Sequence, residues 1–477
     1  MQPLQIMFFC LPFFMFMGIA IQGISFYSFG LALPAIYILS TRKKPLPPFF
    51  LYLGLTLVFL HALFPIFNFI NLLFPDKTVD PSIYQAPILW SKFLLSAFPS
   101  SFFIGGLTLI LFYFISQKLF GSNTSAPAES KDFNVPLRAF LLGLCPASIL
   151  FFGIVFYQHA TGIDLRSIFR SSISYLSVND MFSPAGGFRI YGFFGHPLTV
   201  AGVSLAYFTF VWTLLLAYFS QKKPALFSYL PFHNNKIYVT LILGSTAFVH
   251  LLMIVLSGGR TALAVAGILL FLIPLASYMN KGWARFAKMS VVLIVMAIGV
   301  SLFAQKFNLF KRIESVTTAI TQSQTLEANN NRIYFWKTYA QMIEDKPWTG
   351  EGNYWLRNGV RDEYYNRLGY STLKEKFAAH NMYLEVLGCL GIIGTVLLVW
   401  SMVKLYWIVR REIAVGNEEK SILIAPGIAL LVAFFANAVH GLTQNVFFDS
   451  SVCYIYLEIL IVMVWSRVVL RNSRAEL

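Results

Sequence analysis

The chain has 477 residues, of which 57% are hydrophobic and only 12% are charged. Soluble globular proteins have about 25% charged residues, so this composition excludes an ordinary soluble domain and predicts a polytopic membrane protein. The formal net charge of +15 does not indicate nucleic-acid binding, because no Lys/Arg-rich block stands apart from the hydrophobic segments.

The four cysteines, at positions 10, 145, 389 and 453, lie in or beside apolar segments and form no CxxC pair. We interpret them as packing residues and expect neither a disulfide framework nor a metal site. The N-terminus lacks the basic region of a signal peptide, and a second apolar segment follows almost at once.

A membrane-spanning helix needs about 20 mostly apolar residues, and twelve such segments follow one another here. Their approximate ranges are 4–21, 23–40, 50–74, 98–117, 138–157, 195–219, 237–256, 261–279, 288–305, 381–403, 421–438 and 450–467. The first two are short and closely joined. The predicted fold is therefore all-α, with about 12 transmembrane helices.

Every even-numbered connection between these segments is basic. The residues concerned are Arg42, Lys43, Lys44, Lys118, Lys131, Arg138, Lys222, Lys223, Lys236, Lys281, Arg285, Lys288, Lys404, Arg410, Arg411 and Lys420, with Arg467, Arg471 and Arg474 after the last segment. Because Lys and Arg accumulate in cytoplasmic loops, we expect these connections and both termini to be cytoplasmic. Topology thereby explains most of the net charge.

The odd-numbered connections, at 75–97, 158–194, 257–260, 306–380 and 439–449, then face the other side. The longest divides the chain into three predicted parts. Residues 1–305 hold helices 1–9, residues 306–380 form a periplasmic amphipathic helical loop, and residues 381–477 hold helices 10–12 and a cytoplasmic tail. Residues 121–130 are interpreted as a flexible cytoplasmic linker.

Two helices are predicted in the long loop. Asn330 or Asn331 can cap the first, which begins near Arg332 and stops at Pro347. Its expected apolar face consists of Ile333, Trp336, Ala340 and Ile343. Residues 348–353 are typical of a turn, and residues 355–377 are predicted to be helical again, with Leu356, Val360 and Tyr364 on one side. Such a domain would lie on the outer leaflet.

A short motif, Ser257-Gly258-Gly259-Arg260, joins the seventh and eighth segments. The two glycines permit a tight reversal, and Ser257 or Thr261 can cap the next helix. Arg260 would then stand at a helix N-terminus, which suits a phosphate. The alternative is an arginine that extends to lipid headgroups.

Arg332 lies in the first turn of its predicted helix, where a cation opposes the helix dipole, so helix stability does not explain an arginine at this position. The alternative is a surface arginine that contacts lipid phosphate. His380 lies at the membrane mouth, where it could transfer a proton or serve a structural role. Gly391 and Gly394 further along are expected to be close-packing positions.

Further polar residues are expected at the same mouth. They are Arg189 and His196 before the sixth segment, and Asn437, His440, Gln444 and Asn445 after the eleventh. Glu385 and Glu458 lie within segments, where we expect internal hydrogen bonding. The outer face thus combines Arg, His and Asn with few carboxylates and no metal cluster. This combination suits a diphosphate held without a metal by arginines, beside a base.

The motifs occur in a characteristic order: Ser-Gly-Gly-Arg, Asn-Arg-x-x-x-Trp, Pro-Trp-x-Gly-x-Gly, then His380-Asn381 followed after nine residues by Gly391-x-x-Gly394. This pattern resembles the O-antigen ligase superfamily, which also holds O-antigen polymerases. The resemblance covers about Gly186 to Gly394 and elsewhere extends only to topology. The segment from Arg189 is similar to the family's Arg-x-x-Gly-x-Phe element, except that His196 stands where Asn is common.

The resemblance implies a cofactor-free glycosyltransferase of the bacterial inner membrane with a periplasmic active site. Its donor would be a glycan on undecaprenyl pyrophosphate, and its acceptor lipid A-core or another lipid-linked glycan. By matching positions, Arg260 and Arg332 would stabilise the pyrophosphate and His380 would be the base. Arg189, His196, Asn381 and the Ser257, Gly258 and Gly259 turn would bind substrate.

Three functions remain open from the sequence. They are ligation to lipid A-core, polymerisation of lipid-linked repeat units, and transport of lipid-linked sugars. The ligase form of the histidine motif favours ligation. A transporter should show internal repeats and broken helices in mid-membrane, and the sequence shows no repeat.

Overall fold

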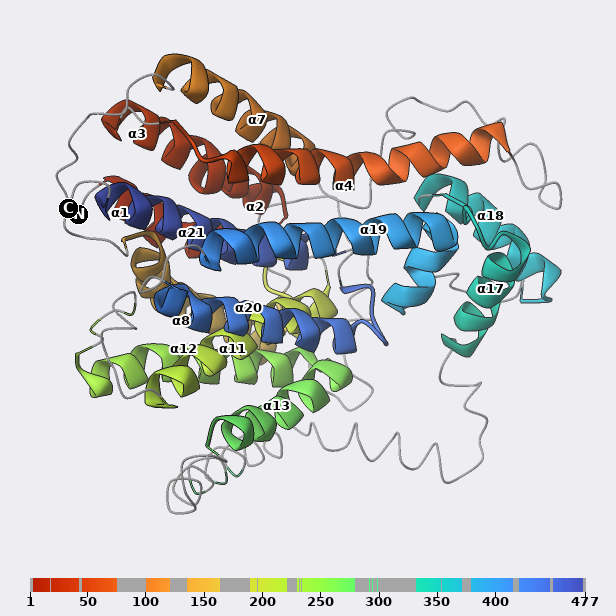
Figure 1. The fold of residues 1–477 in the computed structure, drawn as a ribbon. Helices are drawn as coiled ribbons and strands as arrows, with labels where there is room; N and C mark the ends of the chain where they lie inside the picture. Colours follow the sequence, from red (N-terminus) through yellow and green to blue (C-terminus); the bar gives the residue numbers. More distant parts are fainter. Residues whose placement is uncertain are drawn as a thin grey trace.

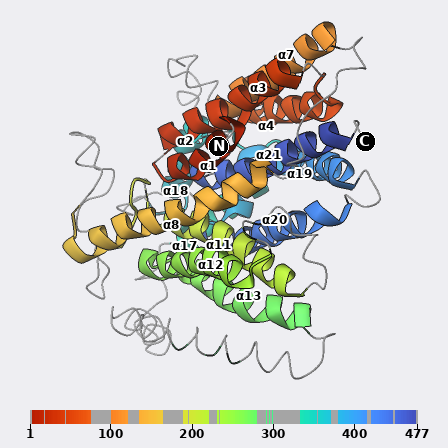
Figure 2. The ribbon, with the colours of Figure 1, turned by 90° about the vertical axis from the view of Figure 1, so that its left-hand side faces the viewer.

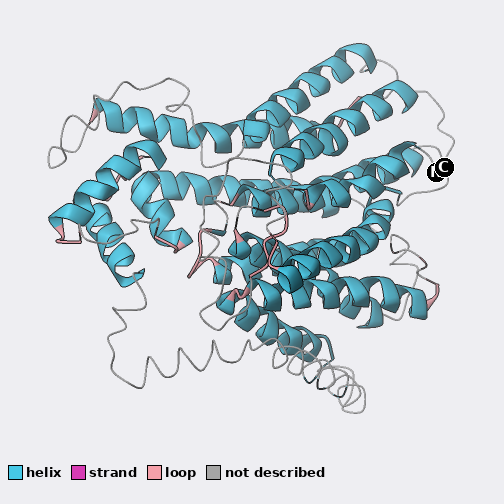
Figure 3. Ribbon diagram, turned by 180° about the vertical axis from the view of Figure 1, so that it is seen from behind, coloured by secondary structure: helices cyan, strands magenta, loops and turns pink. Residues whose placement is uncertain are grey.

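The computed structural model consists of helices, and no strand occurs among the residues that it describes (Figure 1, Figure 3). Those residues are 3–17, 19–42, 45–74, 100–120, 135–163, 189–194, 196–220, 230, 232, 234–278, 291, 294, 298, 332–352, 354–370, 379–414, 420–446 and 449–474. The predicted linker at 121–130 lies outside them.

The helices up to the long loop are α1 (Pro3–Met15), α2 (Ile19–Ser25), the π-helix η1 (Phe26–Ala32), α3 (Leu33–Arg42), α4 (Pro48–Leu73), α7 (Ser100–Phe120), α8 (Val135–Thr161), α11 (Pro197–Ser220), α12 (Lys236–Ser257) and α13 (Arg260–Tyr278). Those that follow are α17 (Arg332–Asp345), α18 (Tyr354–Arg367), α19 (Met382–Ala414), α20 (Lys420–His440) and α21 (Ser450–Arg474).

Seven of these stretches are long and apolar enough to cross a membrane: Ile21–Ser40, Pro48–Asn71, Phe102–Phe120, Pro136–Thr161, Pro197–Ser220, Lys236–Ser257 and Met382–Trp407. Shorter apolar helices cover Pro3–Met15, Arg260–Pro274, Ala425–His440 and Ser451–Ser466. An all-helical, multi-pass membrane protein is thus confirmed. The ninth predicted segment, 288–305, lies almost wholly outside the described residues, so the number twelve stays a prediction.

The break between the first two helices lies between Met15 and Ile19. The sequence predicted this break near residue 22. Gln22 is fully buried, and its side-chain amide donates a hydrogen bond to the carbonyl oxygen of Met15. Because its side-chain N–H finds an acceptor inside the bundle, this glutamine does not interrupt the second helix.

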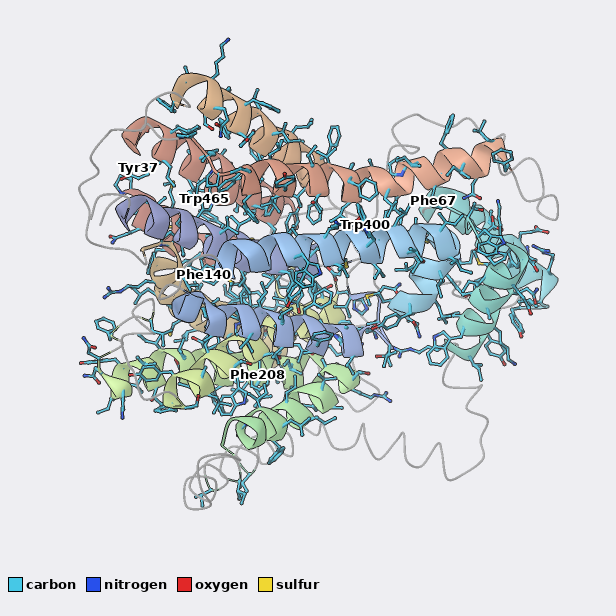
Figure 4. All side chains as sticks on the ribbon, in the orientation of Figure 1. Tyr37, Phe67, Phe140, Phe208, Trp400 and Trp465 are labelled. Atoms are coloured by element: carbon cyan, nitrogen blue, oxygen red, sulfur yellow. The ribbon has the colours of Figure 1, made fainter. Side chains whose placement is uncertain are left out.

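Helix α11 is buried on almost every face (Figure 2). It packs against α12, α20 and α13, and Phe208, labelled in Figure 4, belongs to its buried surface. A helix that is apolar all round suits either a protein core or a membrane span, and α11 lies inside the bundle. Glu458 of α21 reaches this helix and accepts a hydrogen bond from the Tyr207 hydroxyl at 2.6 Å, so its expected internal hydrogen bond is present.

Helix α19 contains a break at Gly391, where φ is 59° and ψ is −168°, and its first turns bend away from the rest (Figure 1). The turn after Pro347 fills this break with four backbone hydrogen bonds. Glu351 and Gly352 N–H donate to the carbonyls of Gly388 and Cys389 at 2.8 and 2.9 Å, and Ile392 and Ile393 N–H donate to the carbonyls of Pro347 and Trp348 at 2.8 and 3.1 Å.

Glycine is required on both sides of this contact. A Cβ on Gly391 would lie 2.4 Å from the Trp348 carbonyl carbon, and one on Gly350 would lie 2.6 Å from that of Cys389. Gly394 approaches Phe67 of α4, which Figure 4 labels near α18. The predicted close-packing role of Gly391 and Gly394 is confirmed.

Helices α17 and α18 form a small domain on this end of the bundle, away from the start of α1 and the end of α21 (Figure 1). Helix α17 begins at Arg332 and ends before Pro347, as predicted, while its expected caps lie outside the described residues. Helix α18 ends at Arg367, earlier than predicted.

The predicted apolar face of α17 is wrong. Its buried residues are Phe335, Thr338, Tyr339 and Met342, whereas Ile333 and Trp336 are partly exposed. The helix carries apolar residues on two sides. The aromatic and thioether side is buried because Tyr339 and Met342 pack with Val360 and Tyr364 of α18.

We predict that Gly391→Ala destabilises the protein by about 2–4 kcal/mol, because the new methyl group meets backbone atoms and the residue has a positive φ. The unfolding temperature of the detergent-purified protein measures this. Gly153→Ala in α8 is the matched control, since a Cβ there meets nothing within 4 Å. Equal unfolding temperatures for the two variants would contradict the requirement for glycine at this backbone contact.

Candidate functional site

Four segments distant in sequence meet at the end of the bundle that carries α17 and α18. They are residues 189–194 with His196, the turn from Ser257 to Arg260, the start of α17, and residues 379–381 before α19. The connection from α20 to α21 contacts several of them.

Arg189 is joined to the second segment by a hydrogen bond from its Nε to the carbonyl oxygen of Ser257 at 3.1 Å. The chain after it is anchored to α8, because Tyr191 and Gly192 N–H donate to Gln158 Oε1 at 2.9 and 2.8 Å. The arginine is thereby held between two helix ends.

The turn from Ser257 to Arg260 reverses the chain as predicted. Gly258 has a φ of 68° and its N–H donates to the carbonyl of Val255. Ser257 Oγ accepts the N–H of Gly259 at 3.2 Å. A Cβ on Gly259 would lie 2.7 Å from Cβ of Ala201, so the turn lies directly against α11. Arg260 is exposed at the first position of α13.

Arg189, Arg260 and Arg332 interact electrostatically although they come from three parts of the chain. Burial, with the charges of Arg260 and Arg332, lowers the pKa of Arg189 to about 10. Burial and Arg260 lower the pKa of Arg332 as well. Among the described residues, none of the three forms an ion pair with a carboxylate. Such a cluster is suited to bind an anion.

Helix α17 holds Arg332 and His380 near one another. The Trp336 indole Nε1 donates to the carbonyl oxygen of Ala379 at 3.0 Å, and the rings of Phe335 and His380 lie 6.1 Å apart. The charge of Arg332 acts on His380. The predicted cation and the predicted base are thus brought together.

His380 has a φ of 47°, in the left-handed region that non-glycine residues rarely adopt. Its Nδ1 lies 3.4 Å from Gln444 Oε1. Because an amide oxygen only accepts, Nδ1 carries the proton and the lone pair of the neutral ring is on Nε2. Burial and the charge of Arg332 lower the pKa of His380 below 6.5, partly opposed by the Gln444 hydrogen bond. The ring is therefore neutral at pH 7.

Two neighbours fix this strained residue. The Asn381 side chain caps α19, since its Oδ1 accepts the N–H groups of Tyr383 and Leu384 at 3.0 and 3.2 Å. Glu385 reaches back and accepts the N–H of Ala379 at 3.0 Å. The expected internal hydrogen bonding of Glu385 is thus present, and it supports the backbone before His380.

The connection from α20 to α21 joins three helix N-termini. Thr443 donates to Thr261 of α13 at 2.7 Å, and the Gly441 carbonyl accepts the Met382 N–H of α19 at 2.8 Å. Thr199 of α11 donates to Asp449. Neither Thr443 nor Asp449 could be predicted from sequence, because hydroxyls and single carboxylates in loops follow no periodic pattern.

Several predicted substrate-binding residues have local structural roles. His196 Nδ1 accepts the N–H of Leu198 at 3.0 Å and caps α11. Asn381 caps α19, and Ser257, Gly258 and Gly259 shape their turn. Substrate binding by these groups stays a prediction. Among the described residues, no three His, Cys, Asp or Glu side chains lie close enough together to hold a metal ion.

These features define a multi-pass membrane protein with a cationic site at one end of its helix bundle. Residues 245–399, less than half of the chain, match the family model described as O-antigen ligase. The matched part contains Arg260, Arg332, His380 and Gly391. The resemblance predicted from the sequence is confirmed. No curated protein is significantly similar to the chain.

We predict that Glu385→Ala lowers the free energy of unfolding by about 1–3 kcal/mol, because it leaves the buried Ala379 N–H without its acceptor. Glu385→Gln keeps an acceptor oxygen and should retain most of the stability. Thermal unfolding of both purified variants measures the difference. If the two variants lose equal stability, the backbone hydrogen bond is not what Glu385 contributes.

Proposed function

We propose that the protein is an O-antigen ligase-type glycosyltransferase that moves a glycan from undecaprenyl pyrophosphate to a sugar hydroxyl of lipid A-core. The observation that carries this proposal is the convergence of three arginines and a neutral histidine at one end of a membrane bundle. The family match supports a membrane glycosyltransferase of the ligase or polymerase type. The substrates and residue roles are our proposal.

Arg189, Arg260 and Arg332 would hold the pyrophosphate. Guanidinium groups match phosphate oxygens with paired N–H donors and stay charged at neutral pH. Arg260 also stands at a helix N-terminus, whose free N–H groups favour an anion. Negative charge builds up on the pyrophosphate oxygen as the glycosidic bond breaks, so these fixed cations stabilise the transition state more than the ground state.

His380 would be the general base. Its Nε2 takes the proton of the acceptor hydroxyl while that oxygen bonds to the anomeric carbon. The carbon–oxygen bond to pyrophosphate breaks on the opposite side, and its electron pair leaves with undecaprenyl pyrophosphate. A single displacement of this kind inverts the anomeric configuration. The Gln444 hydrogen bond to Nδ1 selects the tautomer that places the lone pair on Nε2.

The proposed setting is the bacterial inner membrane, with the site facing the periplasm and both termini in the cytoplasm. The proposed division into 1–305, 306–380 and 381–477 makes the middle part a lid that carries Arg332 at one end and His380 at the other. Membrane lipids would then surround both the bundle and the bound donor lipid.

A reconstituted assay tests this function. The purified protein receives lipid-linked glycan with and without lipid A-core, and the products are separated by size. Capped lipid A-core supports ligation, whereas lengthened lipid-linked chains would identify a polymerase. Movement of the lipid-linked glycan across vesicles without any new glycosidic bond would indicate a transporter and refute the proposal.

We predict that His380→Ala lowers kcat for glycan transfer by roughly 10²- to 10⁴-fold, because the acceptor proton loses its base. The variant should still bind inorganic pyrophosphate with nearly the affinity of the unmodified protein, as the arginines remain. Steady-state kinetics and calorimetry measure the two quantities. Undiminished transfer would refute the catalytic assignment.

The pH dependence of kcat/KM reports ionisations of the free enzyme. A base must be neutral, so activity is present above the pKa of His380 and falls as the pH drops through it. Because that pKa is lowered from 6.5, we predict an acid limb whose midpoint lies below pH 6.5.

Arg332→Gln removes a cation that lowers this pKa, so the acid limb should move to higher pH. Lys337→Gln on the same helix is the control, because Lys337 is not among the groups that act on His380. An acid limb that stays in place in Arg332→Gln would contradict the electrostatic coupling.

A further inference from the structure

His440 ends α20 and is only 1% exposed. Neither of its ring nitrogens has a hydrogen-bond partner among the described residues. A buried polar group without a partner destabilises a fold by about 1–3 kcal/mol, so native proteins seldom keep one without a reason. A packing role alone would be served better by an apolar side chain.

The surroundings of His440 point to the candidate site. Its ring interacts electrostatically with Arg332, which itself interacts with Arg260. The next residue, Gly441, accepts the hydrogen bond from Met382, two positions after His380. Thr443, three residues on, bonds to Thr261 beside Arg260. The end of α20 is therefore linked both to the turn that carries Arg260 and to the one that carries His380.

The ordinary explanation for a histidine at a helix C-terminus is donation to the last carbonyl groups or a charge that complements the helix dipole. Both ring nitrogens of His440 lack such an acceptor among the described residues, and the cation Arg332 opposes a second positive charge there. A neutral ring with an unused N–H, beside an anion-binding cluster, suits a substrate oxygen instead.

We propose that His440 is a substrate-binding residue whose ring N–H donates a hydrogen bond to a pyrophosphate oxygen of the donor lipid. This inference rests on the proposed function. It adds a fourth donor to the three arginines and places it on a different helix from any of them. The proton on the ring stays there throughout the reaction.

Inorganic pyrophosphate is the probe, titrated calorimetrically into the detergent-purified full chain. His440→Gln keeps an N–H donor and should retain most of the affinity. His440→Glu has nearly the shape of glutamine, but it lacks the donor and adds a negative charge, so it should weaken binding roughly 10- to 100-fold. His440→Leu lacks the donor without adding a charge. Arg260→Ala is the positive control, and His250→Leu is the matched control, because His250 is equally buried but bonds to Ser148. Its affinity should not change.

Thermal unfolding without pyrophosphate separates binding from structure. His440→Leu should unfold at the same or a higher temperature than the unmodified protein, since it removes an unpaired polar group, yet it should bind pyrophosphate more weakly than His440→Gln. Equal affinities for His440→Leu and His440→Gln would also overturn the proposal. Equal affinities for His440→Gln and His440→Glu would overturn the proposal, as would an unmodified protein that does not bind pyrophosphate.

The two proposals fail in different ways. Pyrophosphate affinity that depends on His440, in a protein that transfers no glycan, would leave this inference standing and refute the transferase. Glycan transfer with normal pyrophosphate affinity in His440→Glu would do the reverse.

Discussion

The structure depends on the backbone hydrogen bonds between the turn at residues 347–352 and the break in α19 at Gly391. A break inside a membrane helix leaves N–H and carbonyl groups that lipid cannot satisfy. The turn supplies partners for four of them, so the connection between α17 and α18 completes the helix. The first turns of α19 begin just after His380. The same hydrogen bonds therefore determine the position of the proposed base relative to the bundle.

The site is assembled from helix termini, where free N–H groups and capping side chains are available. Helices α11, α13 and α19 all begin there, and the connection between α20 and α21 bonds to each of them. Asn381 and His196 serve as caps, so residues that look like ligands in sequence also fix backbone geometry. A single loop substitution can therefore disturb several helix ends at once.

Local signals in the sequence predicted much of this arrangement. The glycines of the Ser257 turn, the start of α17 and the stop at Pro347 each depend on neighbouring residues alone. The buried face of α17 was predicted wrongly because both of its apolar sides have helical spacing, and only contact with Tyr364 selects one. The connection between Thr443 and Thr261 required tertiary structure, as these hydroxyls lie far apart in the chain.

The arginine cluster and the strained His380 both destabilise the folded protein. Three cations in electrostatic contact repel one another, and a left-handed φ at a non-glycine residue costs about 1–3 kcal/mol. Backbone hydrogen bonds and the aromatic packing of α17 offset both. Groups assembled in advance need not reorganise as charge develops on a leaving pyrophosphate. An anion that relieves the repulsion would also stabilise the fold, so donor binding and stability are coupled by the same electrostatic interaction.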